Sequence, residues 1–165
     1  MNFALNNTAL STARHELGGA IAQGNLTPKI LSNVMSSAFH GTDASGAWDW
    51  RTAYDVMQAA ALDVAQLKVG VGHAFAKQGL EVLSEIASRL PTETRRSERQ
   101  MQLQQFSTAL EWGWVAACAA QVSPSDIVLE PSAGTGCLAR LAQMSAQADK
   151  AIFFFQAEDG IRDAH

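Results

Sequence analysis

Apolar positions recur at helical spacing through much of the N-terminal part of the chain. In the stretch "NLTPKILSNVMSSAFHG", residues 25–41, one apolar face repeats through Ile30, Leu31, Val34, Met35 and Phe39. Thr27 is suited to cap the start of this helix, Pro28 to occupy its first position, and Gly41 to end it. The pattern therefore predicts an amphipathic helix with local signals at both ends.

Two further helices are predicted before the first hundred residues end. The polar break "GTDASGAWDW", residues 41–50, leads into an Ala-rich stretch that predicts one long helix from Trp48 to near Ala76. A shorter helix over residues 80–90 is expected to end at Pro91. The polar stretch "TETRRSERQ", residues 92–100, predicts a connector or a helix start. Residues 1–95 are therefore predicted to form a helical N-terminal region.

The pattern changes in the second part of the chain. Residues 109–122, "ALEWGWVAACAAQV", are apolar on most sides, as in a buried helix, and "SPSD" at 123–126 predicts a turn. The run "IVLE", residues 127–130, is rich in strand formers and predicts a short buried parallel strand. "PSAGTG" then turns sharply into an amphipathic helix that begins at Cys137. A strand, a Gly-rich turn and a helix in this order predict the opening of a Rossmann-like α/β unit.

The Gly-rich turn indicates a nucleotide-like ligand, and its residues narrow the choice. A P-loop needs a Lys after its last Gly, and Gly136 is followed by Cys137. The dinucleotide motif GxGxxG is incomplete because Ala139 stands in its third place, although Ala is sometimes accepted there, so an NAD-type ligand stays open. Glu130 would repel a pyrophosphate but attract the ammonium group of a methionine moiety. S-adenosylmethionine, which carries adenosine and an ammonium but no phosphate, suits the turn better.

These residues also carry a family resemblance. "LEPSAGTG", residues 129–136, resembles the first cofactor-binding motif of class I S-adenosylmethionine-dependent methyltransferases, in the form typical of N6-adenine DNA methyltransferases. "QQFSTA", residues 104–109, resembles the motif that these enzymes place just upstream, against the methionine end of the cofactor. The resemblance implies a site for S-adenosylmethionine made of Phe106, Ser107, Thr108, Glu130, Pro131, Ala133, Gly134, Thr135 and Gly136. Ser107 and Thr108 are equally suited to cap a helix. Ala109 stands where the family usually has Pro, which would stiffen that loop.

A wider resemblance covers most of residues 40–141. "SGAWDWRTAYDVMQAA" and the segment from "LPTETRRSERQ" to "LEPSAGTG" are similar to the N-terminal part of bacterial strawberry notch-like proteins, which join a methyltransferase region to a superfamily 2 helicase. The implied fold is a mainly α N-terminal region followed, over residues 96–151, by the first strand, Gly-rich turn and helix of a truncated methyltransferase domain. DNA is the implied partner, and the implied reaction transfers a methyl group to adenine N6 of a base flipped out of the duplex.

The implied catalysis has no candidate residue in this chain. The family's catalytic motif is Asn/Asp-Pro-Pro-aromatic, and the 165 residues contain no such sequence. We therefore assign no catalytic residue and expect the chain itself to be inactive. The alternative is a non-catalytic module that binds nucleic acid or a partner beside the helicase.

The last residues predict a foreign tail. "QAEDGIRD", residues 156–163, can be encoded by CAA GCA GAA GAC GGC ATA CGA GAT, which looks like the flow-cell adapter of a short-read sequencing library. We expect residues 152–165 to be translated adapter and the natural sequence to diverge near Lys150.

Composition adds few constraints. The net charge of −4 gives no global attraction to nucleic acid, although a local basic patch is compatible with it. Residues 95–99, "RRSER", are predicted to be a solvated basic face rather than a phosphate contact, and the four Trp residues to be core anchors rather than base-stacking platforms. No signal peptide, membrane span or metal-ligand spacing is recognised, which predicts a cytoplasmic protein with reduced cysteines.

Overall fold

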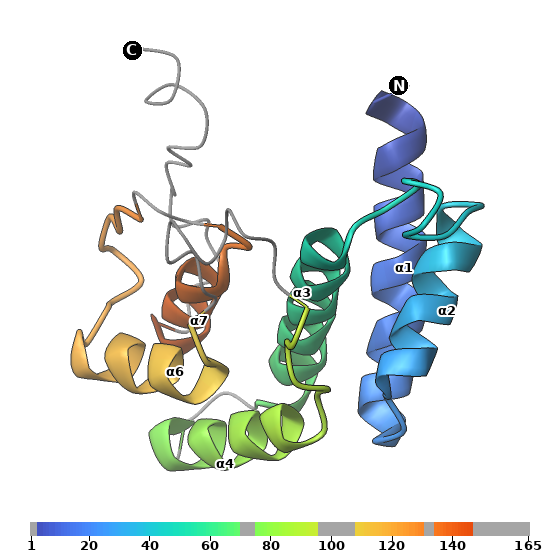
Figure 1. The fold of residues 1–165 in the computed structure, drawn as a ribbon. Coiled ribbons are helices and arrows are strands. Elements are labelled where there is room, and N and C mark those ends of the chain that lie inside the picture. The colour runs from blue at the N-terminus through green and yellow to red at the C-terminus, as the bar shows by residue number, and fades with distance from the viewer. Residues whose placement is uncertain (1–2, 70–74, 96–107, 131–133, 147–165) are drawn as a thin grey trace. The chain divides into compact units, whose positions relative to one another are not determined.

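The structure is a computed structural model that describes residues 3–69, 75–95, 108–130 and 134–146 (Figure 1). Within these ranges the chain forms α1 (Phe3–Gln23), α2 (Pro28–Ala38), α3 (Trp50–Lys68), α4 (Phe75–Ser88), α6 (Leu110–Ala119) and α7 (Cys137–Ala146). The chain divides into two compact units, the first made of residues 1–64 and 88–106, the second of residues 65–87 and 107–165.

In the first unit, α1 and α2 lie side by side and are joined by a short connection (Figure 1). Gly24, with φ of 69°, ends α1 in the left-handed region that favours glycine. The amide of Asn25 then donates to the carbonyl of Ala20, at 3.1 Å, which satisfies a carbonyl at the end of α1. The connection therefore turns the chain back within a few residues.

The predicted signals around α2 are confirmed at its start and differ at its end. Thr27 accepts a hydrogen bond from the amide of Ile30 at 3.2 Å, and Pro28 takes the first position. At the other end His40, not Gly41, adopts the left-handed conformation, with φ of 52°. The amide of Gly41 donates to Ser36 O at 3.1 Å, and that of His40 to Ser37 O at 3.3 Å. This is the Schellman arrangement with a His in the place usually taken by Gly.

The core of the first unit is closed by α3. Gly18 of α1 faces Val64 of α3, since a Cβ there would lie 3.9 Å from Val64 Cγ2, at an ordinary van der Waals distance. The fully buried side chains include Leu17, Ile21, Leu31, Met35, Met57 and Leu62. At the edge of this core the Arg14 guanidinium donates to both carboxylate oxygens of Asp63, at 2.5 and 2.6 Å. A bidentate pair of this kind fixes orientation as well as adding energy.

The single long helix predicted from Trp48 to near Ala76 is wrong in its extent. The observed helix α3 ends at Lys68, and the next helix, α4, already begins at Phe75. The helix predicted over residues 80–90 therefore starts five residues earlier and ends at Ser88, before Pro91. The sequence does contain a stop signal, Gly70 and Gly72 after the basic Lys68, but the prediction gave it less weight than the Ala-rich composition on both sides.

The second unit is organised around Trp114 of α6. Its side chain is 1% exposed, and its indole N–H donates to the carbonyl of Ala76 at 2.8 Å. Gly79 of α4 leaves room for the ring, because a Cβ there would lie 2.2 Å from Trp114 Cζ2. On α6, Gly113 plays the same part toward α7, where a Cβ would lie 2.7 Å from Leu141 Cδ1. Two glycines thus allow α6 to pack closely against both neighbouring helices.

The predicted Rossmann-like α/β opening is wrong, since the described part of the chain is entirely helical apart from turns and irregular segments. Residues 127–130 follow the predicted turn, in which Ser123 N donates to Asp126 Oδ2 at 2.8 Å, but they form no strand. A strand needs a neighbour for its backbone hydrogen bonds, and no described segment supplies one. Instead of being buried, Ile127 is 82% and Leu129 66% exposed.

Candidate functional site

The Gly-rich turn is retained in the structure, although the predicted strand before it is not. Gly134 and Gly136 have φ of 52° and 74°, both in the left-handed region that glycine adopts at little cost. Helix α7 begins directly afterwards, with the amide of Arg140 donating to Gly136 O at 2.9 Å. A turn without Cβ atoms at these two positions leaves the backbone accessible to a ligand at the start of α7.

The upstream motif meets this turn through Thr108. The Cys137 thiol, on the first residue of α7, lies 4.0 Å from the Thr108 carbonyl, in the geometry of a weak S–H donor bond. Thr108 Cγ2 also lies 3.9 Å from the position that a Cβ on Gly113 would take. The two motifs that the sequence pattern linked are therefore close to each other at Thr108.

Ala109 departs from the family pattern in residue type but not in backbone conformation. It is the N-cap of α6, with φ of −60° and ψ of 140°, and it makes no side-chain capping bond. Proline fixes φ near −65°, so Ala109 already has the φ that a proline at this position would impose. Thr108 precedes the N-cap position, so the capping role considered for it is not observed.

Charge at the turn comes from Glu130 and Arg140. Burial raises the pKa of the Cys137 thiol to about 11, the nearby Arg140 guanidinium lowers it, and the Glu130 carboxylate raises it further. Arg140 of α7 also donates to Gln66 Oε1 at 2.7 Å, which holds its guanidinium against the last turn of α3. Glu130 is half-buried, and its carboxylate is among the groups that raise the pKa of Cys137, the first residue of α7.

Part of the predicted site lies outside the described residues. This applies to Phe106, Ser107, Pro131 and Ala133. Of the described members, Glu130 and Thr135 are half-buried, whereas Thr108 and Gly134 are exposed. Glu130 lies at the end of an irregular segment instead of the end of a strand.

The structure also contains a pocket that the sequence pattern did not indicate. It belongs to the first unit, has a volume of about 350 Å3, and is lined by Pro28, Lys29, Leu31, Ser32, Asn33, Asp43, Trp50, Tyr54, Pro91, Thr92, Thr94 and Arg95. The lining comes from α2, from the polar break before α3, from the start of α3 and from the segment after α4.

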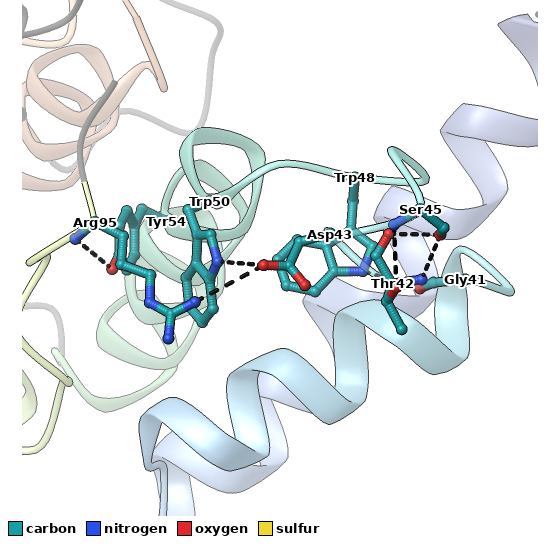
Figure 2. Close-up of polar contacts among 8 residues, drawn as sticks. All are labelled: Gly41, Thr42, Asp43, Ser45, Trp48, Trp50, Tyr54 and Arg95. Atoms are coloured by element: carbon teal, nitrogen blue, oxygen red, sulfur yellow. Dashed lines mark hydrogen bonds and ion pairs between the residues drawn. The ribbon is translucent and has the colours of Figure 1, made fainter. Parts of the chain in front are cut away.

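Polar contacts hold one wall of this pocket together (Figure 2). The Trp50 indole N–H donates to Asp43 Oδ2 at 2.9 Å, and Arg95 Nη1 lies 3.8 Å from the same oxygen. The Arg95 guanidinium carbon lies 4.4 Å from the centroid of the Trp50 ring, and the Arg95 amide donates to the Tyr54 hydroxyl at 3.2 Å. Trp48 donates to Gly41 O at 3.0 Å and contacts Trp50 edge-on.

The Trp anchors predicted for the core differ from one another in the structure. Trp48 and Trp114 are buried as predicted, whereas Trp50 is half-buried in the pocket wall and Trp112 is 72% exposed. The signal that could have found the pocket was the pair of Trp residues following a polar loop that contains an acid, in "TDASGAWDW". Arg95 is 41 positions from its partner Tyr54, so local patterns gave no indication of that contact.

Other classes of site find little support in the described ranges. Those ranges contain no group of three or more His, Cys, Asp or Glu side chains placed to hold a metal ion. Nor is any helix in them long and apolar enough to cross a membrane. Comparison of the chain with models of protein families, with curated proteins and with solved structures gave no match.

Proposed function

We propose that Thr108 and residues 130–136 form a binding site for S-adenosylmethionine in a protein of the methyltransferase and helicase type. The single observation that carries the proposal is the contact between Thr108 and Cys137, which joins two motifs far apart in the sequence at one turn. A bound S-adenosylmethionine would supply a methyl group, and the proposed acceptor is adenine N6 in DNA. The chain's own role in this proposal is to bind the donor.

The properties of the turn support this ligand over phosphate-bearing ones. A carboxylate at Glu130 attracts the ammonium group of the methionine moiety and repels a pyrophosphate. The glycines at 134 and 136 carry no Cβ that would block a flat adenosine from approaching the backbone. Ala109 has a φ of −60°, the value that the family's Pro would enforce, so the departure does not change the backbone at that position.

Isothermal titration calorimetry of the 165-residue chain with S-adenosylmethionine tests the proposal. Binding is expected to weaken by about tenfold in Glu130→Gln, since a hydrogen-bonded charge contributes roughly 1.5–3 kcal/mol. The matched control is Glu81→Gln, which removes the same charge from the exposed side of α4 and is expected to leave the affinity unchanged.

A second readout establishes that Glu130→Gln acts at the turn. Because the Glu130 carboxylate raises the pKa of Cys137, its removal should lower that pKa, which thiol absorbance can follow. Tighter binding of NAD than of S-adenosylmethionine would replace the proposal by a dinucleotide site. No binding of either ligand by the folded chain would overturn it.

A further inference from the structure

The pocket of the first unit has no part in the proposed donor site, and its chemistry indicates a different ligand. We propose that it binds one nucleotide of a single-stranded nucleic acid, with the base stacked on Arg95 above Trp50 and the phosphate near Lys29. The shared chemistry is a planar base carrying a phosphate, which a free nucleotide also offers. The inference does not depend on donor binding at the Gly-rich turn.

The stacking surface is the first argument. The Arg95 guanidinium carbon lies 4.4 Å from the Trp50 ring centroid, and the Arg95 side chain is 63% exposed. One side of the guanidinium therefore contacts the indole while much of it remains accessible to solvent. Proteins stack unpaired bases on aromatic rings and on guanidinium planes of this kind. The Trp50–Arg95 pair presents a guanidinium plane with the indole behind it (Figure 2).

The charge of the pocket is the second argument. Its lining contains two basic side chains, Lys29 and Arg95, and one acidic side chain, Asp43. Asp43 Oδ2 accepts the Trp50 indole N–H at 2.9 Å, and its separation from Arg95 Nη1 is 3.8 Å, at the long end of an ion pair. Arg95 therefore keeps donors for a phosphate or a base edge. The lining is locally basic although the whole chain carries a net charge of −4.

The third argument is preorganisation of the stacking pair. The Arg95 amide is held by the Tyr54 hydroxyl at 3.2 Å, and Trp50 is held by Asp43 and by the edge of Trp48. These contacts hold both residues in place, so binding would order few additional groups, and ordering is a main cost of association. Hydroxyl and amide groups able to donate to or accept from a base edge are added by Ser32, Asn33, Thr92 and Thr94.

Size and phosphate chemistry favour a strand over a free nucleotide. A volume of about 350 Å3 is at the lower end of the range of ligand pockets and suits a single base with its sugar. The lining includes no glycine, so it offers no Gly-rich loop to surround a triphosphate. Two basic side chains match the single charge that each nucleotide of a strand carries better than they match the several charges of a triphosphate.

The experiment measures fluorescence anisotropy of a dye-labelled oligothymidylate of about 10 nucleotides, titrated with the full chain at about 50 mM salt. Arg95→Gln is expected to weaken binding about tenfold, in the range that loss of one base stack produces. Arg95→Lys keeps the charge but loses the guanidinium plane, and it should be nearly as weak. Arg51→Gln is the matched control, because Arg51 is exposed, carries the same charge and lies outside the pocket lining.

Folding of each variant is checked by its thermal unfolding midpoint, which should be unchanged for the largely exposed Arg95. Competition then separates the sources of the ligand. An unlabelled oligothymidylate should displace the probe, and an abasic sugar-phosphate oligomer of the same length should not. Displacement by thymidine monophosphate at equal nucleotide concentration would assign the pocket to a free nucleotide. That result would overturn the proposal that the ligand is a single-stranded nucleic acid.

Three other outcomes overturn the proposal. They are no binding at low salt, equal weakening by Arg95→Gln and Arg51→Gln, and full binding by Arg95→Lys. Titration of Arg95→Gln with S-adenosylmethionine should give the wild-type affinity, so failure here and failure of the donor site are distinguishable.

Discussion

The first unit buries its large apolar side chains, whereas the second leaves several of them in solvent. Among the described residues, the large apolar side chains with high exposure all belong to the second unit: Leu67, Trp112, Val115, Ile127 and Leu129. The first unit instead combines its buried core with polar contacts between separate segments, such as Arg14 with Asp63 and Arg95 with Tyr54. The second has a buried core too, with Leu83, Ile86, Leu141 and the ring of Trp114 fully buried, and glycines at 79 and 113 make room for Trp114 and Leu141.

This difference shows how differently the two units are specified. In the first unit, local helix signals define the helices, and polar contacts between residues far apart in the sequence stabilise their packing. In the second, helix packing is close where glycine permits it, but apolar residues of α6 and of residues 127–130 remain uncovered. Exposed apolar side chains that gather on a surface often mark a contact with another molecule or segment. The comparison therefore predicts that substitutions in the two units change the free energy of unfolding by different amounts.

The largest expected effect is the loss of Trp114. Trp114→Ala should lower the free energy of unfolding by about 3–5 kcal/mol, because it removes a fully buried ring and leaves a cavity. Hydrogen exchange should then show lost protection in α6 and α7 with protection retained in α2. Trp112→Ala, on the same helix but 72% exposed, should stay within about 0.5 kcal/mol of wild type. Equal loss of protection in α2 would show that the two units unfold together.

Gly79 should be the next most sensitive position. Gly79→Ala places a Cβ 2.2 Å from Trp114 Cζ2, and such overpacking costs about 1–3 kcal/mol. Gly19, inside α1 of the first unit, has open space where a Cβ would stand, with nothing within 4 Å, so Gly19→Ala should stabilise by about 0.5–1 kcal/mol. Urea unfolding of both variants measures the contrast, and effects of the same sign would contradict it.

Burial of Cys137 predicts a pH dependence of the second unit. The thiol pKa rises from its ordinary value near 9 to about 11 in the folded chain, so the folded state holds its proton more tightly between these values. The stabilisation is complete below pH 9 and is lost as the pH rises toward 11, by about 1–2 kcal/mol. Urea unfolding between pH 9 and 11 should show a smaller decline in the free energy of unfolding for Cys137→Ala than for wild type. Cys118→Ala is the comparison: burial raises the pKa of that half-buried thiol too, so a change in the same direction but smaller is expected, and an equal change would contradict the assignment.

In the first unit the strongest polar contact should have a smaller effect. Asp63→Asn should cost about 1 kcal/mol or less, because both partners of the Arg14–Asp63 pair are more than a third exposed. A double-mutant cycle with Arg14→Gln isolates the pairwise part. Asp55→Asn weakens a 3.9 Å pair with Arg51 within α3 and should change stability by less than about 0.5 kcal/mol. A coupling energy near zero for Arg14 and Asp63 would show that this contact does not contribute to the stability of the first unit.

The smallest effect is expected at Ala109. Its φ of −60° matches proline, so Ala109→Pro should stabilise the second unit by about 0.4–1 kcal/mol by restricting the unfolded chain. Ala120 has a similar φ of −69°, but its amide donates to Ala116 O, so Ala120→Pro should destabilise instead. Urea midpoints of the two variants provide the measurement. Destabilisation by Ala109→Pro would mean that the amide of Ala109 donates a hydrogen bond that stabilises the folded chain.

Features set by neighbouring residues were predicted well. The start of α2 followed from Thr27 and Pro28, and the turn at 123–126 from its own polar residues, because caps and turns depend on local chemistry. The strand at 127–130 was wrong because strand formation depends on a partner from elsewhere in the chain. The break between α3 and α4 was missed because the helix-favouring sequence on both sides of it was given more weight than Gly70 and Gly72 between them.

The two candidate sites differ in the same way: one is formed by residues that are close in the sequence, the other by residues that only the fold brings together. The Gly-rich turn was visible in the sequence because its glycines and acid are adjacent, and the left-handed φ of Gly134 and Gly136 agrees with that prediction. The pocket was missed because it combines residues of α2, of the loop before α3 and of the segment after α4. Only the fold brings Arg95 to Trp50 and Asp43.

Neither unit is a continuous piece of polypeptide, since the first resumes at residue 88 after the second has contributed residues 65–87. During synthesis, α1, α2 and most of α3 leave the ribosome well before Tyr54 meets the amide of Arg95. No single proteolytic cut or gene truncation can release the first unit intact, and a product ending near residue 64 would lack one wall of its pocket. An excised version requires deletion of residues 65–87, a linker between the two stretches of the first unit, and truncation after residue 106.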